Sequence, residues 1–440
     1  MSKFRYIAVN LCRFVLSLTL IFSGYVKAID PLGTQYKIQD YAQVLGIGSL
    51  LPDWSTLTAS VLLSATEFCL GIFLLFAIHR RVVSRLCVVL MAVMTLISIW
   101  LWLFDPVSDC GCFGDALVLT NGQTLLKNVV LLCAAIVVCR WPLVMVRFIS
   151  RSNQWIVVNY TLLFTLLSSV YCLYDLPLID FRPYHTGADI REGMSIPEGA
   201  PQPEFDTTFI LEKDGERREF TLADYPDSTW TFIDSKTVMT KKGYVPPIHD
   251  FSITRQSDGE DITDSLLASK DYTFLLISPS LEHASDSDFG EIDQIYEYCT
   301  DHGYGFYGLT ASGEKGIERW RELTGAEYPF CQADGTTLKT IIRSNPGLLL
   351  LHDGKVVRKW SHNFLPRLTE LSGRLEELPI GQISQDHLAR KIAIILLWFV
   401  LPLTVLTVAD RLWAWTRWLR HRKSRKQSPK RQDNPTTNKH

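Results

Sequence analysis

Six long apolar stretches constrain this chain more than any other feature of its sequence. They cover about residues 6–28, 57–78, 82–104, 125–146, 155–174 and 392–408. A transmembrane helix needs roughly 20 consecutive apolar residues, so the sequence predicts six membrane-spanning helices. The first stretch follows Lys3 and Arg5, as a signal peptide would, but it is long, contains Arg13 and lacks a small-residue cleavage site. We therefore expect it to remain in the membrane as a helix.

The apolar residues are unevenly distributed along the 440 residues. They gather before residue 175 and again near the C-terminus, whereas the segment between is polar and acidic. This distribution predicts a membrane protein with a soluble insert. The last 30 residues are strongly basic and begin just after the sixth stretch. Such a tail marks the cytoplasmic side of a membrane more often than a nucleic-acid partner, and Trp413–Arg420 fits an anchor on anionic lipid.

The positions of the basic residues predict the orientation of the helices. Lys and Arg cluster at the N-terminus, at residues 80–85, at residues 140–151 and in the tail. In contrast, residues 105–124 hold no Lys or Arg, and residues 29–56 hold only Lys37. Because cytoplasmic loops carry the excess of basic residues, we expect both termini in the cytoplasm. The loop at 105–124 and the insert then face the opposite side, where disulfides persist in bacteria.

Two cysteines in the loop between the third and fourth stretches are the main candidates for chemistry. Cys110 and Cys112 are separated only by Gly111, in the sequence Asp109-Cys110-Gly111-Cys112-Phe113-Gly114-Asp115. Thiols this close can cycle between dithiol and disulfide, and a strained disulfide in so small a ring is more oxidising. A loop at the membrane surface would expose them to partners. A structural role remains open, and so does a metal site, although Asp109 and Asp115 do not complete a zinc ligand set.

Glu67 is the second candidate, because it lies near the middle of the second apolar stretch. An ionisable residue at that depth is costly and marks function by default. It could pair with Arg13 or Lys27, relay protons to a quinone-like acceptor, or form a hydrogen bond between helices while protonated. For Lys27 itself, snorkelling at the membrane interface is the simpler interpretation.

The insert contains two regions. Residues 177–250 form a Pro-rich connector that contains a β-hairpin turning at Asp214-Gly215. From about residue 251 to 380, strands alternate with helices and end in a hairpin turning at Asp353-Gly354, which predicts an α/β fold. Strands are expected at 272–278, 305–310, 347–351 and 356–360, and helices at 289–302, 315–323 and 336–343.

This order of elements resembles the thioredoxin fold, with Asn345-Pro346-Gly347 where that family carries its cis-proline. At the position of the family's Cys-x-x-Cys motif, however, the chain reads Ser278-Pro279-Ser280-Leu281-Glu282-His283-Ala284-Ser285. Without an attacking thiolate, we expect this domain to be inactive in thiol exchange. Cys299 and Cys331 lie elsewhere in the domain, and the sequence leaves open whether they are free or form a disulfide. His283, with Asp286 and Asp288 nearby, is better explained as part of a solvated loop than as a metal site.

The first four stretches resemble the DoxX-like family, specifically its methylamine-utilisation MauE branch. The resemblance rests on Phe22–Lys27, on Ala65–Gly71 around Glu67 and on Asp109–Gly114. It implies a four-helix, redox-associated membrane domain. In the methylamine system, the branch is implicated in maturing a disulfide-rich dehydrogenase subunit beside a separate thioredoxin-like partner. This chain would carry both parts, and nothing in it indicates methylamine as a substrate.

These observations predict a helical membrane bundle with an extramembrane thioredoxin-like domain. The expected regions are 1–150 (four-helix domain), 151–176 (fifth helix), 177–250 (connector), 251–380 (thioredoxin-like domain), 390–410 (sixth helix) and 411–440 (basic tail). The expected function is thiol–disulfide chemistry or maturation of envelope proteins at the bacterial inner membrane, carried by Cys110 and Cys112. The alternative is a non-catalytic scaffold whose thioredoxin-like domain binds a partner. Whether the chain is an enzyme stays open.

We expect membrane lipid and an envelope protein as partners, and no nucleic acid or metal. No cofactor motif is evident, and a quinone remains open as the electron acceptor. The sequence does not indicate an oligomeric state.

Overall fold

The computed structural model of the chain describes residues 3–107, 110–201, 204–213, 216–221, 230–241, 243–383 and 388–427. It divides the chain into two compact units. The membrane unit contains residues 1–182 and 385–440, and the insert unit contains residues 183–384. The sixth apolar helix thus belongs with the first five, although some 200 residues separate it from them in sequence. The connector expected at 177–250 is also divided, because residues 177–182 belong to the membrane unit.

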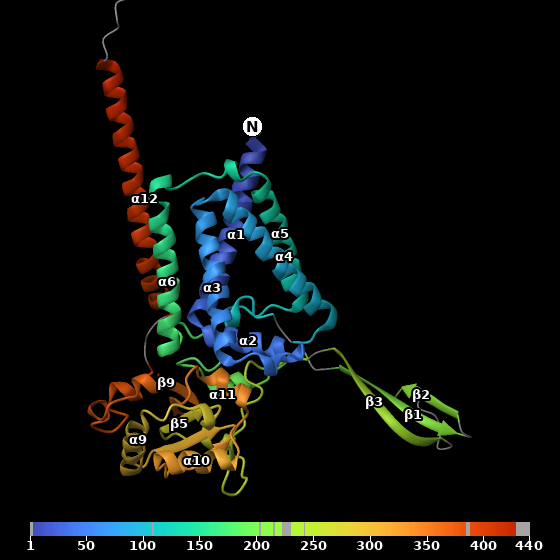
Figure 1. The fold of residues 1–440 in the computed structure, drawn as a ribbon. Helices are drawn as coiled ribbons and strands as arrows, with labels where there is room; N and C mark the ends of the chain where they lie inside the picture. The colour runs from blue at the N-terminus through green and yellow to red at the C-terminus, as the bar shows by residue number, and fades with distance from the viewer. Residues whose placement is uncertain are drawn as a thin grey trace, which may run out of the picture. The chain divides into compact units, whose positions relative to one another are not determined.

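The secondary-structure elements described in the membrane unit are all helices (Figure 1). Its helices are α1 (Lys3–Ile29), α2 (Pro31–Val44), α3 (Asp53–Leu75), α4 (Arg80–Phe104), α5 (Asn121–Arg140), α6 (Gln154–Tyr174) and α12 (Leu388–Gln427). Short 3₁₀ turns lie at Gly48–Leu50, Gly114–Ala116, Pro142–Val144 and Arg151–Asn153. Within the described residues, all except α2 are long and apolar enough to cross a membrane, which confirms the six predicted spans.

Two ends of these helices differ from the prediction for physical reasons. The fourth span ends at Arg140 rather than near residue 146, because Pro142 cannot continue a helix and disfavours helical geometry in the residue before it. It begins at a capping box, in which Thr120 accepts from the backbone N–H of Gln123. The helix of the sixth span does not end near residue 408 but continues to Gln427, whereas its apolar candidate span covers Leu388–Leu419. The tail beyond residue 427 lies outside the described residues.

The six spanning helices form two packed groups. Helices α1, α3, α4 and α5 surround one buried core, which contains Leu16, Leu70, Cys87 and Ala135. Helices α6 and α12 lie side by side along α3, with Phe68, Val157 and Phe399 in a second core (Figure 1). The Tyr160 hydroxyl on α6 also donates to the Trp398 carbonyl on α12. The arrangement is therefore a four-helix bundle with two further helices, as the sequence predicted.

The insert unit contains a six-stranded sheet and a separate three-stranded sheet. The larger sheet has the order β4-β7-β6-β5-β8-β9, in which β5 pairs parallel with β6 and antiparallel with β8. Its strands are β4 (Thr254–Arg255), β5 (Thr273–Ser278), β6 (Gly305–Thr310), β7 (Phe330–Gln332), β8 (Gly347–His352) and β9 (Lys355–Ser361). The helices of the insert unit are α7 (Ile190–Met194), α8 (Thr263–Ala268), α9 (Phe289–His302), α10 (Glu314–Thr324) and α11 (Gly335–Ile341).

Strand order confirms the thioredoxin-like fold. Its central part runs β6-β5-β8-β9: a parallel pair joined through α9, followed by an antiparallel hairpin. Every residue of β5 is buried, as expected of a central strand covered on both faces. Helices α9 and α10 cover the face that contains Phe274, Leu276 and Phe330. The Asn345–Pro346 peptide bond is cis, at the position where the resemblance places a cis-proline.

The smaller sheet contains the expected hairpin and one strand that the sequence did not reveal. Its order is β2-β1-β3, built from β1 (Glu204–Lys213), β2 (Glu216–Thr221) and β3 (Thr231–Lys241). Both β2 and β3 pair antiparallel with β1. The turn residues Asp214 and Gly215 lie outside the described residues.

Candidate redox site

Two glycines bring α1 and α3 into close contact and so make the site. A Cβ atom at Gly24 would lie 2.3 Å from the backbone nitrogen of Phe68. A Cβ atom at Gly71 would lie 2.8 Å from the backbone nitrogen of Ile21. Small residues are what allow helix backbones to approach this closely within a membrane. Because Lys27 lies one turn after Gly24, and Glu67 one turn before Gly71, the same contact brings these two charged residues together.

Lys27 and Glu67 form a buried ion pair. The Nζ atom of Lys27 lies 2.8 Å from both Oε1 and Oε2 of Glu67, and the two side chains are only 4% and 3% exposed. The Ser23 hydroxyl lies 2.7 Å from Oε2 and accepts a hydrogen bond of 3.2 Å from Lys27. The interpretation of Lys27 as a snorkelling residue is therefore wrong: its ammonium points into the bundle, where a carboxylate compensates it.

Arg13, the other partner considered for Glu67, has a different role. Its guanidinium is fully buried and donates to the carbonyls of Leu74, Leu75 and Val146. The first two carbonyls belong to the last turn of α3, whose carbonyls have no partner within the helix. Arg13 therefore caps α3 at the end of the bundle that carries the basic connectors, away from the cysteine loop.

In the cysteine loop, of which the structure describes residues 105–107 and 110–120, the stretch from Cys110 to Phe113 packs against α1 and α2. Cys110 and Cys112 are half-buried. The carbonyl of Cys110 accepts from the Tyr41 hydroxyl on α2, and that of Cys112 lies within hydrogen-bonding distance of the Ser23 hydroxyl, at 2.7 Å each. Non-helical backbone inside a membrane bundle must have its polar groups satisfied by the protein. The turn itself depends on Gly111, whose φ of +64° favours glycine.

The two loop sulfurs lie next to each other. The Sγ atoms of Cys110 and Cys112 are 2.9 Å apart, and both cysteines are free thiols in this structure. With Cys110 as the hydrogen-bond donor, this contact holds the pKa of the Cys112 thiol below its usual value, against an opposing effect of burial. The ammonium groups of Lys127 and Lys27 lower it further. The same contact and burial raise the pKa of the Cys110 thiol.

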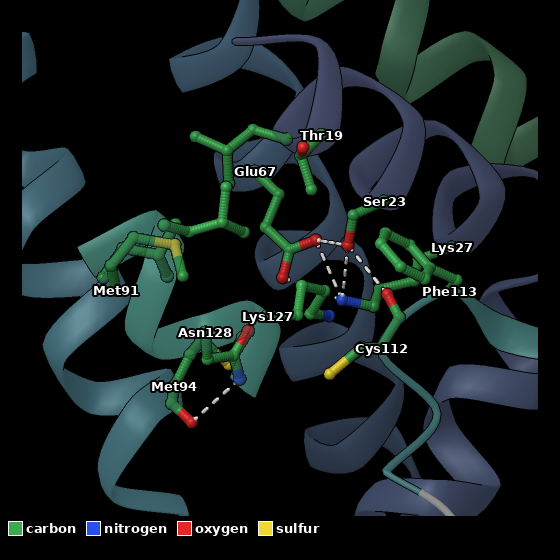
Figure 2. Close-up of a pocket in the computed structure, with 13 residues that line it drawn as sticks. Thr19, Ser23, Lys27, Glu67, Met91, Met94, Cys112, Phe113, Lys127 and Asn128 are labelled. Carbon is green, nitrogen blue, oxygen red and sulfur yellow. Dashed lines mark hydrogen bonds and ion pairs between the residues drawn. The ribbon is translucent and has the colours of Figure 1, made fainter. Parts of the chain in front are cut away.

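A small cavity lies between Cys112 and the ion pair (Figure 2). Its volume is about 30 Å³, enough for roughly one or two water molecules. The amino groups of Lys27 and Lys127, the Glu67 carboxylate and the Cys112 sulfur all point into it (Figure 2). Its other lining residues are Thr19, Leu20, Ser23, Leu90, Met91, Met94, Phe113, Asn128 and Leu131. The structure thus brings the Cys110–Cys112 pair close to Glu67, which lies far from it in the sequence.

Two residues of this cavity were not singled out in the sequence. Lys127 lies in the second turn of α5, with its Nζ atom 4.2 Å above the Phe113 ring. A lysine within a predicted transmembrane stretch is itself a signal of function, so Lys127 could have been found in the same way as Glu67. Ser23 belongs to the Phe22–Lys27 motif, but nothing in the sequence indicated that its hydroxyl would face both Glu67 and the loop.

The insert unit holds no comparable thiol pair. At the position of the family's motif, the Ser280 hydroxyl contacts Nδ1 of His283 at 2.9 Å and Oε2 of Glu282 at 2.8 Å. Cys299 and Cys331 are both buried free thiols, so the disulfide that the sequence left open is not formed. Cys299 packs on the same face of the sheet as Phe330. Since neighbouring strand residues point to opposite faces, Cys331 lies on the other face.

Metal binding has no support in the part of the chain that the structure describes. No group of three or more His, Cys, Asp or Glu side chains there could hold a metal ion. His283 therefore lacks a ligand set among these residues. Asp109, part of the alternative metal site at the cysteine loop, lies outside the described residues.

Comparisons with known proteins match parts of this chain. No curated protein matches it. Solved structures that resemble parts of it include a candidate protein disulfide isomerase from Bacteroides thetaiotaomicron (19% identity, 29% of this chain, 85% of that chain, TM-score 0.24). They also include an uncharacterised conserved protein from Geobacillus kaustophilus (14% identity, 31% of this chain, 82% of that chain, TM-score 0.24). Residues 205–242 match a domain of unknown function, DUF8463. The bundle that holds the cysteine loop and Glu67 matches, over residues 5–140, the family of methylamine utilisation protein MauE.

Proposed function

We propose that this membrane protein carries out thiol–disulfide exchange with envelope proteins through Cys110 and Cys112, and so supports their maturation. The observation that carries the proposal is the 2.9 Å contact between the two sulfurs, beside a cavity that also holds the Lys27–Glu67 pair. A buried ion pair is expensive to maintain within a membrane and is seldom kept for stability alone. Its position beside a thiol pair suits a reaction in which protons move together with electrons.

The proposed exchange has a simple balance. A thiolate of the substrate protein attacks the Cys110–Cys112 disulfide, whose S–S bond breaks as a mixed disulfide forms. The second substrate thiol then displaces that intermediate, leaving an oxidised substrate and two reduced cysteines. To restore the disulfide, the pair must lose two electrons to an acceptor, together with the protons that its thiols hold. The Ser23 hydroxyl, within 2.7 Å of both Glu67 and the Cys112 carbonyl, offers a route for one of these protons.

A quinone is the acceptor class that we propose, since it takes up two electrons and two protons and dissolves in the membrane. The cavity beside Cys112 is too small to admit a quinone ring. A separate apolar pocket of about 330 Å³ lies between α1, α3, α6 and α12, at the lower end of the ~300–1,000 Å³ range of ligand sites. Phe22 lines this pocket, and its ring packs 5.4 Å from that of Phe113 in the cysteine loop.

We further propose that the protein lies in a bacterial inner membrane with the cysteine loop and the insert unit on the outer side. The two ends of the bundle differ in charge. Arg80 and Arg411 hydrogen-bond to the connector between α5 and α6 at one end, where Arg13 also lies. The other end carries α2 and the cysteine loop, with few basic residues. The positive-inside rule assigns the basic end to the cytoplasm.

The redox state of the cysteine pair in cells tests the proposed function. Cells are quenched with acid and labelled with a mass-tagged alkylating reagent, and the state of Cys110 and Cys112 is read from the mobility shift. We expect an oxidised fraction that falls when the oxidant supply is removed. The Cys110→Ser/Cys112→Ser variant should accumulate reduced envelope thiols. Cys133→Ser, which changes an exposed cysteine on α5, is the matched control. A pair that is never oxidised in cells would refute the proposal.

A scaffold function is the alternative, and one observation favours it. The insert unit has the thioredoxin-like strand order but serines, a glutamate and a histidine where the family's motif lies, so it could bind a partner without thiol chemistry. Under this alternative, the double serine variant would retain its partner and its phenotype in cells. Under the redox proposal, it would lose its effect on envelope thiols.

A further inference from the structure

We propose that Lys127 is a positioning residue of the thiol pair: its ammonium neutralises a thiolate on Cys112, so that Cys112 carries the charge and Cys110 the proton of the reduced state. The proposal rests on the proposed redox function. It assigns different roles to the two cysteines, and it names a residue outside the loop that supports this assignment beside the Cys110–Cys112 contact.

The charges around the cavity favour this assignment. Lys27 from α1 and Glu67 from α3 neutralise each other through two contacts of 2.8 Å. Lys127 from α5 also points into the cavity, and no described carboxylate lies within 4 Å of it. One basic side chain is therefore in excess. The Cys112 sulfur lines the same cavity and is the remaining group that could supply the compensating negative charge.

Other titratable groups near the loop do not change this balance. Tyr41 of α2 donates to the Cys110 carbonyl and adds no negative charge to the cavity. The Lys37 stem lies against Gly111, where an added Cβ would be 3.1 Å from its Cγ. The residues that α4 contributes to the cavity lining are Leu90, Met91 and Met94, none of which titrates. Lys127 is therefore the cation without a carboxylate partner among the residues that line the cavity with Cys112.

Lys127 is also held in place beside the cysteine. Its Nζ atom lies 4.2 Å from the centroid of the Phe113 ring, and Phe113 directly follows Cys112. Phe113 is itself buried and packs against Phe22. A cation–π contact of this kind fixes an ammonium group without neutralising it. Lys127 thus keeps its charge for the sulfur, in agreement with its lowering effect on the pKa of Cys112.

A charged reduced state has a measurable proton balance. If Cys112 is a thiolate, the pair reacts with oxidised glutathione as protein (SH)(S⁻) + GSSG + H⁺ → protein (S–S) + 2 GSH. The equilibrium constant then falls tenfold for each unit increase in pH. If both cysteines are protonated, the reaction is protein (SH)₂ + GSSG → protein (S–S) + 2 GSH, and it does not depend on pH. The difference holds below the usual thiol pKa of about 8.5.

The experiment titrates the purified full-length protein in detergent with glutathione buffers between pH 6.5 and 8. Mass-tagged alkylation reports the fraction of oxidised pair. We expect a change in equilibrium constant close to tenfold per pH unit for the wild type and for Lys127→Arg, which keeps the charge. In Lys127→Met, the equilibrium constant should lose most of its pH dependence, and the equilibrium should shift toward the disulfide. Arg85→Met, which removes an exposed cation from α4, should behave like the wild type.

Distinct outcomes identify which proposal fails. A pair that never forms a disulfide in any buffer refutes the proposed function and, with it, the role of Lys127. A wild-type pair that cycles without pH dependence, or a Lys127→Met variant that keeps it, refutes the role of Lys127 alone. Should Lys127→Met not fold, Lys127→Gln replaces it. The alkylation rate of Cys112 in Cys110→Ser, measured from pH 5 to 9 with and without Lys127→Gln, gives an independent test: an unchanged profile overturns the inference.

Discussion

The Lys27–Glu67 pair makes the sharpest prediction about what holds the bundle together. Removing one partner of a buried ion pair costs about 3–5 kcal/mol, because the other charge stays buried without compensation. Replacing both partners with apolar residues of similar size is neutral or even stabilising by about 1–4 kcal/mol. The pair is 4% and 3% exposed and joined at 2.8 Å, so these values for buried pairs apply.

We therefore expect Lys27→Met and Glu67→Leu each to lower the free energy of unfolding by about 3–5 kcal/mol. The double variant should be near the wild type, so the two single effects would be strongly non-additive. Glu67→Leu should be the more damaging single change, since it leaves both Lys27 and Lys127 without a carboxylate in the cavity.

Unfolding in mixed micelles, titrated with sodium dodecyl sulfate and followed by the fluorescence of the 12 tryptophans, measures these energies. Asp53→Asn is the matched control, because this carboxylate also lies on α3 but is exposed. Single variants as stable as the wild type, or a double variant as unstable as the sum of the two, would show that the pair is not compensated as the structure indicates.

Three further predictions follow from other contacts. Ser23→Ala and Tyr41→Phe each remove a hydrogen bond to a cysteine carbonyl, worth about 0.5–1.5 kcal/mol. Iodoacetamide should therefore react faster with Cys110 and Cys112 in these variants. Thr19→Val should not change the rate, because the Thr19 hydroxyl bonds within α1. Asp410→Asn weakens the hydrogen bonds from Ser150 and Asn153 and should lower the thermal stability of the membrane unit, seen as earlier unfolding of α12. In the insert unit, the Ser312 hydroxyl donates to the Glu282 carboxylate and holds its pKa below the usual value. Glu282 therefore stabilises the folded state at pH values above its unfolded pKa of about 4.3. This contribution is lost as the pH falls through the lower pKa of the folded state. Acid titrations of Ser312→Ala and the wild type should then differ at neutral pH and converge in acid.

Local patterns in the sequence determined most of the elements. The six spans, α9, β6 and the hairpin of β8 and β9 depend on apolar runs, on residue periodicity and on turn residues, all of which act between neighbours in the chain. The missing Cys-x-x-Cys was equally visible, because a motif is a local property. The prediction was less accurate where tertiary packing decided: at the ends of α5 and α12, and at β3, which the sequence did not indicate.

Tertiary structure decided what the candidate residues do. Lys27 and Glu67 are 40 residues apart and Ser23 and Cys112 are 89 apart, so no local pattern could pair them. Their meeting depends on the close approach of α1 and α3 at Gly24 and Gly71, which is a property of two helix surfaces together. The sequence identified Cys110 and Cys112 because closely spaced thiols can form a disulfide, and Glu67 because a charge within a membrane span is costly. The folded bundle brought Cys112 and Glu67 to one cavity and added Lys127, since only packing determines which charges lie within reach of each other.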